Sequence, residues 1–134
     1  MTTLYDSEFQ SILYNEAKNI IGNVWKPNTA KINDRGFKEE ILTFGKFIAE
    51  KKPKGILGNT QQLNFAIPPA FQDWIVDNYF ATVLESGVQK YAIIVSTDLI
   101  TQLSVEQTIE EEKSSGFVTR YFDNDAEALE WLSI

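Results

Sequence analysis

The chain has 134 residues, of which 43% are hydrophobic and 23% are charged, and it carries a formal net charge of −7. This size and balance predict one globular domain with a single core, and the excess of negative charge argues against nucleic acid as a partner. Cysteine and histidine are both absent, which excludes disulfides, thiolate or imidazole metal sites, and the histidine-dependent triads and dyads of many enzymes.

The beginning of the chain predicts a β-hairpin. Residues 1–8 lack the basic and apolar regions of a signal peptide, so we expect a cytoplasmic protein, and we expect these residues to be flexible. Two short β-rich runs follow at 9–14 and 19–25, and a polar tetrad that favours a turn joins them. Gly22, inside the second run, indicates a β-bulge. No apolar run approaches the roughly 20 residues of a membrane helix, so we expect no stable membrane insertion.

A helix and a short inner strand come next. Asn33 and Asp34 are both good N-caps, and the helix is expected to end near Lys51, where a cation suits the negative end of the helix dipole. Residues 55–59 then predict a short strand. The helix carries one apolar stripe with helical spacing, formed by Phe37, Ile41, Phe44 and Ile48.

The second half predicts a long helix and the central strand of the fold. The helix is expected over residues 69–86, because proline suits a first helical turn and Gly87 suits a stop that needs positive φ. Residues 91–96 form an unbroken apolar run rich in β-branched side chains. Such a run is typical of a strand that is buried on both faces.

Three further elements complete the chain. Thr97 or Asp98 is expected to cap a short helical turn, and a capping box beginning at Ser104 predicts a separate second helical stretch. Residues 117–122 predict the last strand. The final helix is expected to begin at one of two good N-caps, Asp123 or Asn124.

The order of these elements predicts an α/β fold. An opening hairpin followed by alternating helices and strands (ββαβαβαβα) is typical of a mixed, mostly parallel sheet, here of about five strands. Residues 1–134 are expected to form this single domain.

Several segments resemble a known family. They are Gly55-Ile56-Leu57, the run from Tyr91 to Ser96, and the ending from Gly116 to Leu132, a strand followed by an acidic cap and Ala-Glu-Ala-Leu-Glu-Trp-Leu. Together with the element order they are similar to SpoIIAA-like proteins of the STAS (sulfate transporter and anti-sigma factor antagonist) fold. The resemblance implies a non-enzymatic protein-interaction or regulatory module.

The same resemblance exposes one departure. Anti-sigma antagonists of the family carry a phosphorylated serine at the start of the helix that follows the inner strand. In this chain the corresponding residues 65–70 contain no serine or threonine, and Pro68 and Pro69 remove amide donors from that turn. Thr60, the nearest hydroxyl, lies too early. We therefore expect a divergent branch without the serine phosphoswitch.

Carboxylate clusters are the remaining candidates for acid–base chemistry. The run 110–112 and the pair Glu39 and Glu40 are interpreted as solvated helix faces. Asp123 and Asp125 are interpreted as helix-start residues rather than a cation site. No cofactor or metal is expected. The three lysines Lys51, Lys52 and Lys54 are interpreted as a helix C-terminus rather than an anion site.

The segment from residue 60 to 71 is the main candidate for a binding surface. It is apolar although it lies in an expected connection at the carboxyl end of a strand, where ligands and partners of α/β sheets tend to bind. It either folds back over the core or forms an exposed apolar patch. The residues proposed for this interaction or ligand surface are Thr60, Phe65, Ile67, Pro68, Pro69, Phe71 and Trp74.

Three functions remain open. The first is an interaction module that meets a protein partner or forms a homodimer through residues 60–80, where Ile67→Asp or Phe71→Asp would abolish assembly but leave the fold intact. The second is a carrier of a small hydrophobic ligand or lipid, by analogy with the lipid-binding CRAL-TRIO fold; a closed pocket of a few hundred cubic ångströms near Phe65 and Phe80 would favour it. A carboxylate-based enzyme ranks last.

Overall fold

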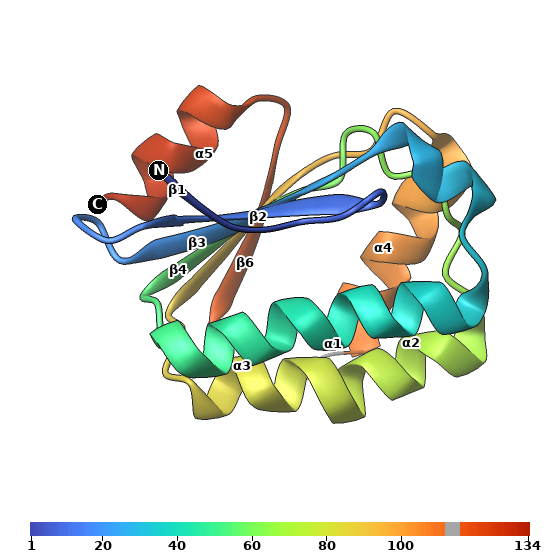
Figure 1. Ribbon diagram of the computed structural model, residues 1–134, viewed down its shortest axis with the longest axis horizontal. Coiled ribbons are helices and arrows are strands. Elements are labelled where there is room, and N and C mark those ends of the chain that lie inside the picture. Colours follow the sequence, from blue (N-terminus) through green and yellow to red (C-terminus); the bar gives the residue numbers. More distant parts are fainter. Residues whose placement is uncertain (112–115) are drawn as a thin grey trace.

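The computed structural model describes residues 1–111 and 116–134, and within these ranges it has a six-stranded mixed sheet. The strands lie in the sheet in the order in which they occur in the chain (Figure 1). An antiparallel meander is formed by β1 (Thr2–Asp6), β2 (Gln10–Asn15) and β3 (Ile20–Trp25). Three strands then continue in parallel with β3, namely β4 (Gly55–Asn59), β5 (Lys90–Ile94) and β6 (Val118–Phe122).

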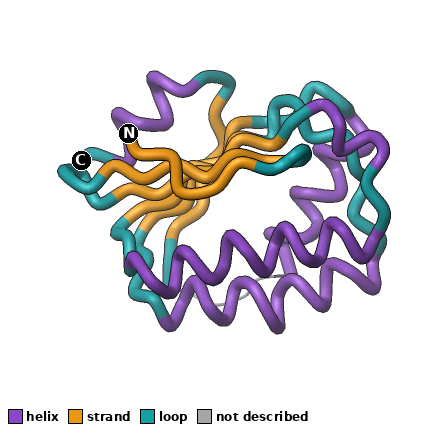
Figure 2. The backbone as a smooth tube through the Cα atoms, in the orientation of Figure 1, coloured by secondary structure: helices purple, strands orange, loops and turns teal. Residues whose placement is uncertain are grey.

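The helices cover the two faces of this sheet unequally. One face is covered by α1 (Asp34–Lys51), by a continuous helix made of α2 (Pro69–Ile75), the π-helical turn η2 (Val76–Phe80) and α3 (Ala81–Glu85), and by α4 (Leu99–Glu111). The opposite face carries α5 (Asp125–Leu132), as Figures 1 and 2 show. A 3₁₀ turn, η1 (Pro27–Lys31), follows β3.

This layering follows from the strand order. Each parallel crossover adds a strand on the same side of the previous one, and right-handed crossovers that advance in one direction place their helices on one face. Only α5, which follows the last strand, is free to cover the other face.

The strand pairings confirm the α/β class, the hairpin and the mixed, mostly parallel sheet. The main core lies between the sheet and α1, α2–α3 and α4, and a smaller one lies beneath α5.

The helix boundaries follow the local signals in the sequence. The Asn33 side chain accepts a hydrogen bond from the Gly36 amide at 2.7 Å and caps α1. Lys52 ends that helix in the left-handed region, with φ of 48°. Gly87, with φ of 82°, follows the long helix that ends at Glu85. The Asn124 side chain accepts from the Glu127 amide and caps α5. These boundaries are confirmed.

The sheet differs from the prediction at its first edge. The segment that we expected to be flexible forms β1, so the sheet has six strands rather than about five. The bulge predicted at Gly22 is wrong, because β2 and β3 pair without a register shift there; the irregularity lies between Thr3 and Tyr5 of β1. A Cβ on Gly22 would lie 3.0 Å from the Leu57 carbonyl oxygen, so close approach of two backbones explains this glycine.

The helix after β5 is continuous, and the predicted second start at Ser104 is wrong. The Asp98 side chain accepts from the Thr101 amide at 2.8 Å, as expected for a cap. The Ser104 hydroxyl instead donates to the Thr101 carbonyl and accepts from the Ile67 amide, so it is satisfied inside the helix. The third glutamate of the acidic run, Glu112, and most of the expected break at 114–116 lie outside the described residues.

Within the described ranges, none of the helices is both long enough and apolar enough to cross a lipid bilayer.

Candidate ligand-binding cavity

The segment proposed as a binding surface folds back over the core. Thr60, Ile67 and Phe71 are buried, Phe65 and Trp74 are half-buried, and only Pro68 and Pro69 are exposed. We call residues 60–68 the strap. Residues 60–71 therefore form no exposed apolar patch, because Leu63, Ile67 and Phe71 belong to the main core.

Hydrogen bonds to distant elements hold the strap in place. The Thr60 hydroxyl donates to the Ile94 carbonyl, and the Ser96 hydroxyl donates to the Leu63 carbonyl at 2.9 Å. The Ile67 amide donates to the Ser104 hydroxyl of α4, also at 2.9 Å. Because these bonds satisfy backbone groups that would otherwise be buried without partners, an extended segment can lie over an apolar core.

Aromatic rings anchor the same segment to α1. The ring of Phe65 stacks on Phe37, with centroids 4.3 Å apart, and Phe37 stacks on Trp25 on its other side at 5.2 Å. The Lys38 ammonium group lies 4.7 Å from the centroid of Phe71 and 5.3 Å from that of Trp74. Phe65 of the strap and the aromatic residues of α2 thus contribute to packing between β3, α1 and α2.

A cavity of about 70 Å³ lies beneath the strap, between the sheet and the helices. Its floor is formed by the inner faces of β3, β4 and β5, and its roof by α1, α2, η2 and α4. Most of the lining is apolar. The side chains that matter for its chemistry are Asn23, Thr60, Tyr79, Phe80 and Tyr91, with Gly58 between two of them on the floor.

The π-helical turn shapes the roof of the cavity. Tyr79 and Phe80 are neighbours in η2, yet both are buried and both line the cavity. Turns of this kind are rare and occur often at functional sites, because the extra residue per turn changes which side chains share a face. Here the turn presents two adjacent aromatic rings to the sheet.

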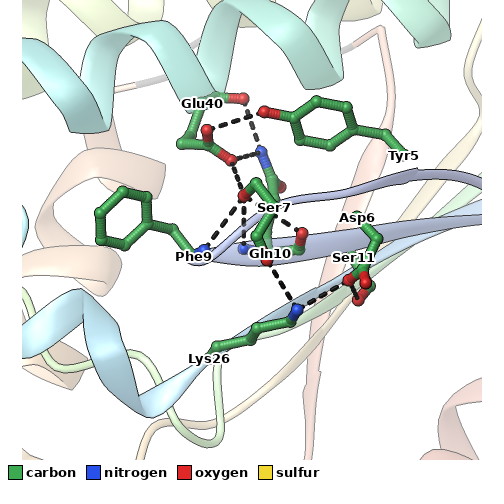
Figure 3. A network of polar contacts seen from close by, with 8 residues as sticks. All are labelled: Tyr5, Asp6, Ser7, Phe9, Gln10, Ser11, Lys26 and Glu40. Atoms are coloured by element: carbon green, nitrogen blue, oxygen red, sulfur yellow. Dashed lines mark hydrogen bonds and ion pairs between the residues drawn. The ribbon is translucent and has the colours of Figure 1, made fainter.

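A buried polar chain leads from α1 to the floor of the cavity. Glu40, only 8% exposed, accepts hydrogen bonds from Tyr5 at 2.9 Å, from Ser7 at 2.8 Å and from the Gln10 side-chain amide at 3.0 Å (Figure 3). Gln10 donates a second bond to the Glu40 carbonyl oxygen at 2.8 Å. The Gln10 Oε1 atom in turn accepts from the Asn23 Nδ2 group at 3.1 Å. This series of hydrogen bonds ends at Asn23.

The Oδ1 atom of Asn23, at the end of this series of hydrogen bonds, is unpartnered. Asn23 is 3% exposed, and within residues 1–111 and 116–134 its Oδ1 atom has no hydrogen-bond partner. A Cβ built on Gly58 would lie 3.6 Å from this oxygen, 3.7 Å from the Tyr91 hydroxyl and 3.2 Å from the Tyr91 Cε1 atom. Gly58 therefore leaves the space in which Asn23 and Tyr91 face the cavity.

Two tyrosines supply the other polar group. The hydroxyl oxygens of Tyr79 and Tyr91 lie 2.7 Å apart. Burial raises the pKa of Tyr91 to about 12 and raises the pKa of Tyr79 well above its ordinary value. Both hydroxyls are therefore neutral at physiological pH. One of the two donates to the other, so the pair retains one hydroxyl proton that their mutual bond does not use.

The interpretation of Glu40 as a solvated residue is wrong. It lies three residues after Phe37 and four before Phe44, which places it on the apolar stripe of α1. That spacing could have identified it. Its partners Tyr5 and Ser7 could not be found from the sequence, because they belong to a segment for which no strand was predicted. Glu39, the other member of the pair, is exposed and lies 3.5 Å from Arg35.

The structure also places the other charged residues considered in the sequence. In the part of the chain that it describes, no group of three or more acidic side chains is arranged to hold a metal ion. Lys51 lies at the end of α1, near Glu50 and over the Tyr14 ring.

Comparison with known proteins gives no relative, since no family model, no curated protein and no solved structure matches this chain.

Proposed function

We propose that the protein binds a small, largely apolar molecule in the cavity beneath the strap. The observation that carries this proposal is a cavity with apolar walls whose floor presents one buried, unpartnered oxygen atom, Asn23 Oδ1. Native interiors rarely leave such an atom unsatisfied unless a ligand, an ion or a water occupies the space. The site therefore has both the surface that attracts an apolar body and a polar group that orients it.

The free volume limits the size of the ligand. About 70 Å³ is well below the roughly 300–1,000 Å³ of ordinary ligand pockets, and below the roughly 150 Å³ of an engineered cavity that admits benzene. A lipid chain does not fit this space, so the lipid version of the carrier hypothesis loses support. A molecule of a few non-hydrogen atoms fits.

The chemistry of the lining favours binding over catalysis. The titratable groups at the cavity are Tyr79 and Tyr91, and burial keeps both protonated at neutral pH. A general acid or base works best with a pKa close to the operating pH. Glu40, the nearest buried carboxylate in the polar chain, is engaged by three donors and does not line the cavity.

Xenon is a suitable probe because it enters small apolar cavities without any polar requirement. Methyl NMR spectra recorded under xenon pressure should show shifts for Ile75, Ile93 and Ile109, which line the cavity. The methyl groups of Leu57 and Ala128, which lie in the core beneath α5, should not move.

A matched pair of variants tests the position. Gly58→Ala places a methyl group against the Tyr91 ring and should abolish the shifts. Gly45→Ala, whose Cβ would lie 3.6 Å from Tyr79 Cδ1 in ordinary contact, should leave them unchanged. Wild-type protein without any xenon-dependent shift at these isoleucines would overturn the proposal.

A second candidate function is assembly with another copy of the chain, favoured by a different surface. Leu99, Ile100 and Leu103 of α4 are 82%, 65% and 54% exposed. Tyr121 of the edge strand β6 lies near Glu106 and Glu110 of the same helix, and burial together with these two charges raises the pKa of Tyr121 to about 12. We call Leu99, Ile100, Leu103 and Tyr121 the α4–β6 surface.

A second copy is the occupant that fits this surface. An edge strand offers main-chain groups that pair with the same strand of a two-fold related copy, and the exposed leucines would extend the contact. Sedimentation velocity should detect a dimer that Leu103→Glu dissociates and Leu42→Glu, on exposed α1 surface, does not. A protein that stays monomeric at high concentration would contradict this candidate.

The STAS-like relationship stays a proposal. It is supported by the order of elements after the hairpin. The start of α2 departs from the resembled family, because Pro68 and Pro69 stand at the turn that carries the serine there. The Thr60 hydroxyl is already engaged with the Ile94 carbonyl. The chain would then be a divergent member without the phosphoswitch.

A further inference from the structure

The polar chain determines which atom of Asn23 faces the cavity. The Gln10 side-chain nitrogen lies 2.8 Å from the Glu40 carbonyl oxygen, an atom that can only accept a hydrogen bond. The NH₂ group of Gln10 must therefore point toward Glu40, and its oxygen must point toward Asn23. The Asn23 NH₂ group donates to that oxygen. Asn23 is left with its oxygen, an acceptor, at the cavity floor.

The tyrosine pair contributes the complementary group. Because one hydroxyl of Tyr79 and Tyr91 donates to the other, one proton of the pair stays available at the cavity. No other hydrogen bond of these two hydroxyls exists in the part of the chain that the structure describes. The other polar side chains of the lining, Thr60 and Thr108, already donate to the Ile94 and Ser104 carbonyls. Among the described residues, Asn23 Oδ1 is therefore the polar atom of the cavity that lacks a partner, and a tyrosine hydroxyl is the donor whose proton remains to be used.

We infer that the ligand is a neutral molecule whose hydroxyl group donates to Asn23 Oδ1, with a small apolar body against Phe80 and its neighbours. This inference rests on the proposed function and adds the chemical class of the ligand. A hydroxyl supplies one donor and accepts at the same oxygen, so it satisfies both protein groups at once.

Other ligand classes fit less well. A carboxylate brings acceptors only, which would face Asn23 Oδ1 without a proton between them, and burying its charge without a cation is costly. A ketone can accept from a tyrosine but leaves Asn23 Oδ1 unsatisfied. A wholly apolar molecule satisfies neither group. A single bridging water satisfies both but leaves the apolar part of the cavity without contacts.

The test compares two molecules of equal heavy-atom number. Propan-2-ol and acetone each have four non-hydrogen atoms, but only the alcohol has a donor. Both are titrated at millimolar concentrations into isotopically labelled wild-type protein, and the Asn23 side-chain amide and the cavity methyl groups are followed by NMR. We expect the alcohol to bind about tenfold more tightly than acetone, because a buried acceptor left unpaired costs about that factor or more.

Each outcome separates the two proposals. Preference for the alcohol that disappears in Asn23→Leu supports the inference, and the wild-type comparison stands if this variant fails to fold. Equal binding of alcohol and acetone in a protein that also binds xenon overturns the hydroxyl inference and leaves the proposed function intact. Failure of both solvents together with xenon overturns both, and the cavity then holds water alone or nothing.

Discussion

The Gln10 side-chain amide bridges two acceptors of one residue, the Glu40 carboxylate at 3.0 Å and the Glu40 carbonyl at 2.8 Å. These two hydrogen bonds join the first hairpin to α1. The Ser7 hydroxyl reinforces it, since it accepts from the Phe9 and Gln10 amides and donates to Glu40. The same contact orients the amide of Asn23, so the geometry of the cavity floor depends on a residue in the roof helix.

Replacing Glu40 should destabilise the protein. In Glu40→Gln, the side chain offers one acceptor in place of two to the Tyr5, Ser7 and Gln10 donors. We expect a loss of about 2 kcal/mol in the free energy of unfolding, measured by urea titration at pH 7. The neighbouring exposed variant Glu39→Gln should change it by less than about 0.5 kcal/mol. Equal losses of unfolding free energy in Glu40→Gln and Glu39→Gln would contradict a stabilising role of the Glu40 carboxylate.

Stability should fall in alkaline solution because of the buried tyrosines. The folded-state pKa of Tyr91 is about 12 and that of Tyr79 is well above 10, both raised first by burial. A raised pKa means that the unfolded chain releases its proton first, near pH 10. The stabilisation is therefore complete below pH 10 and is lost as pH rises from 10 through 12.

The tyrosine variant checks this assignment. Urea unfolding of wild-type protein between pH 9 and 11 should show a falling free energy, with a slope of up to about 1.4 kcal/mol per pH unit for each such group. Tyr91→Phe should flatten the slope, although it lowers stability at pH 7 through the loss of the bond to Tyr79. An unchanged slope would contradict the role of this pair.

Charge introduced at Ile67 of the strap or at Phe71 of α2 should unfold the protein rather than merely prevent assembly. Ile67 and Phe71 are buried, so Ile67→Asp and Phe71→Asp place a carboxylate in the core at a cost of several kcal/mol. Far-UV circular dichroism and urea titration should show the loss of cooperative folding. Ala70→Asp, at an exposed position between them, is the control and should fold normally. Folded, monodisperse Phe71→Asp protein would contradict the burial of this ring.

Two glycine variants should have opposite effects on stability. In Gly22→Ala the new Cβ would lie 3.0 Å from the Leu57 carbonyl oxygen, a backbone atom of the neighbouring parallel strand that cannot easily move. Gly45→Ala meets only the Tyr79 ring at 3.6 Å and gains helix propensity inside α1. We expect Gly22→Ala to lower the melting temperature and Gly45→Ala to raise it. The gain in helix propensity at residue 45 is worth about 0.5–1 kcal/mol in the free energy of unfolding. The same sign for both would be inconsistent with this packing.

Signals confined to a few neighbouring residues were readable from the sequence. The caps at Asn33 and Asn124 and the stop at Gly87 depend on atoms within one helical turn, so they locate α1, α5 and the end of α3. The alternation of elements was enough for the α/β class. The break expected at Ser104 failed because its hydroxyl finds the Ile67 amide, 37 residues away.

The site itself could not be predicted for the same reason. Whether the strap is exposed or buried depends on Thr29, Ser96 and Ser104, which meet it only in the folded chain. The polar part of the cavity combines Asn23 and Tyr91 of the floor with Tyr79 of the roof, and none of them forms a motif with the others. Strand β1 escaped prediction because an edge strand with one half-buried face has only a weak pattern.

The identical order of strands in chain and sheet has a consequence for synthesis on the ribosome. Each strand hydrogen-bonds to the one made just before it, so the sheet can grow at one edge as the chain emerges. No completed strand has to wait for a partner encoded much later, and the intermediate always exposes a single growing edge. We expect the antiparallel meander to form first and the parallel strands, which pair only across whole helical crossovers, to add more slowly, with the last strand and α5 closing the domain.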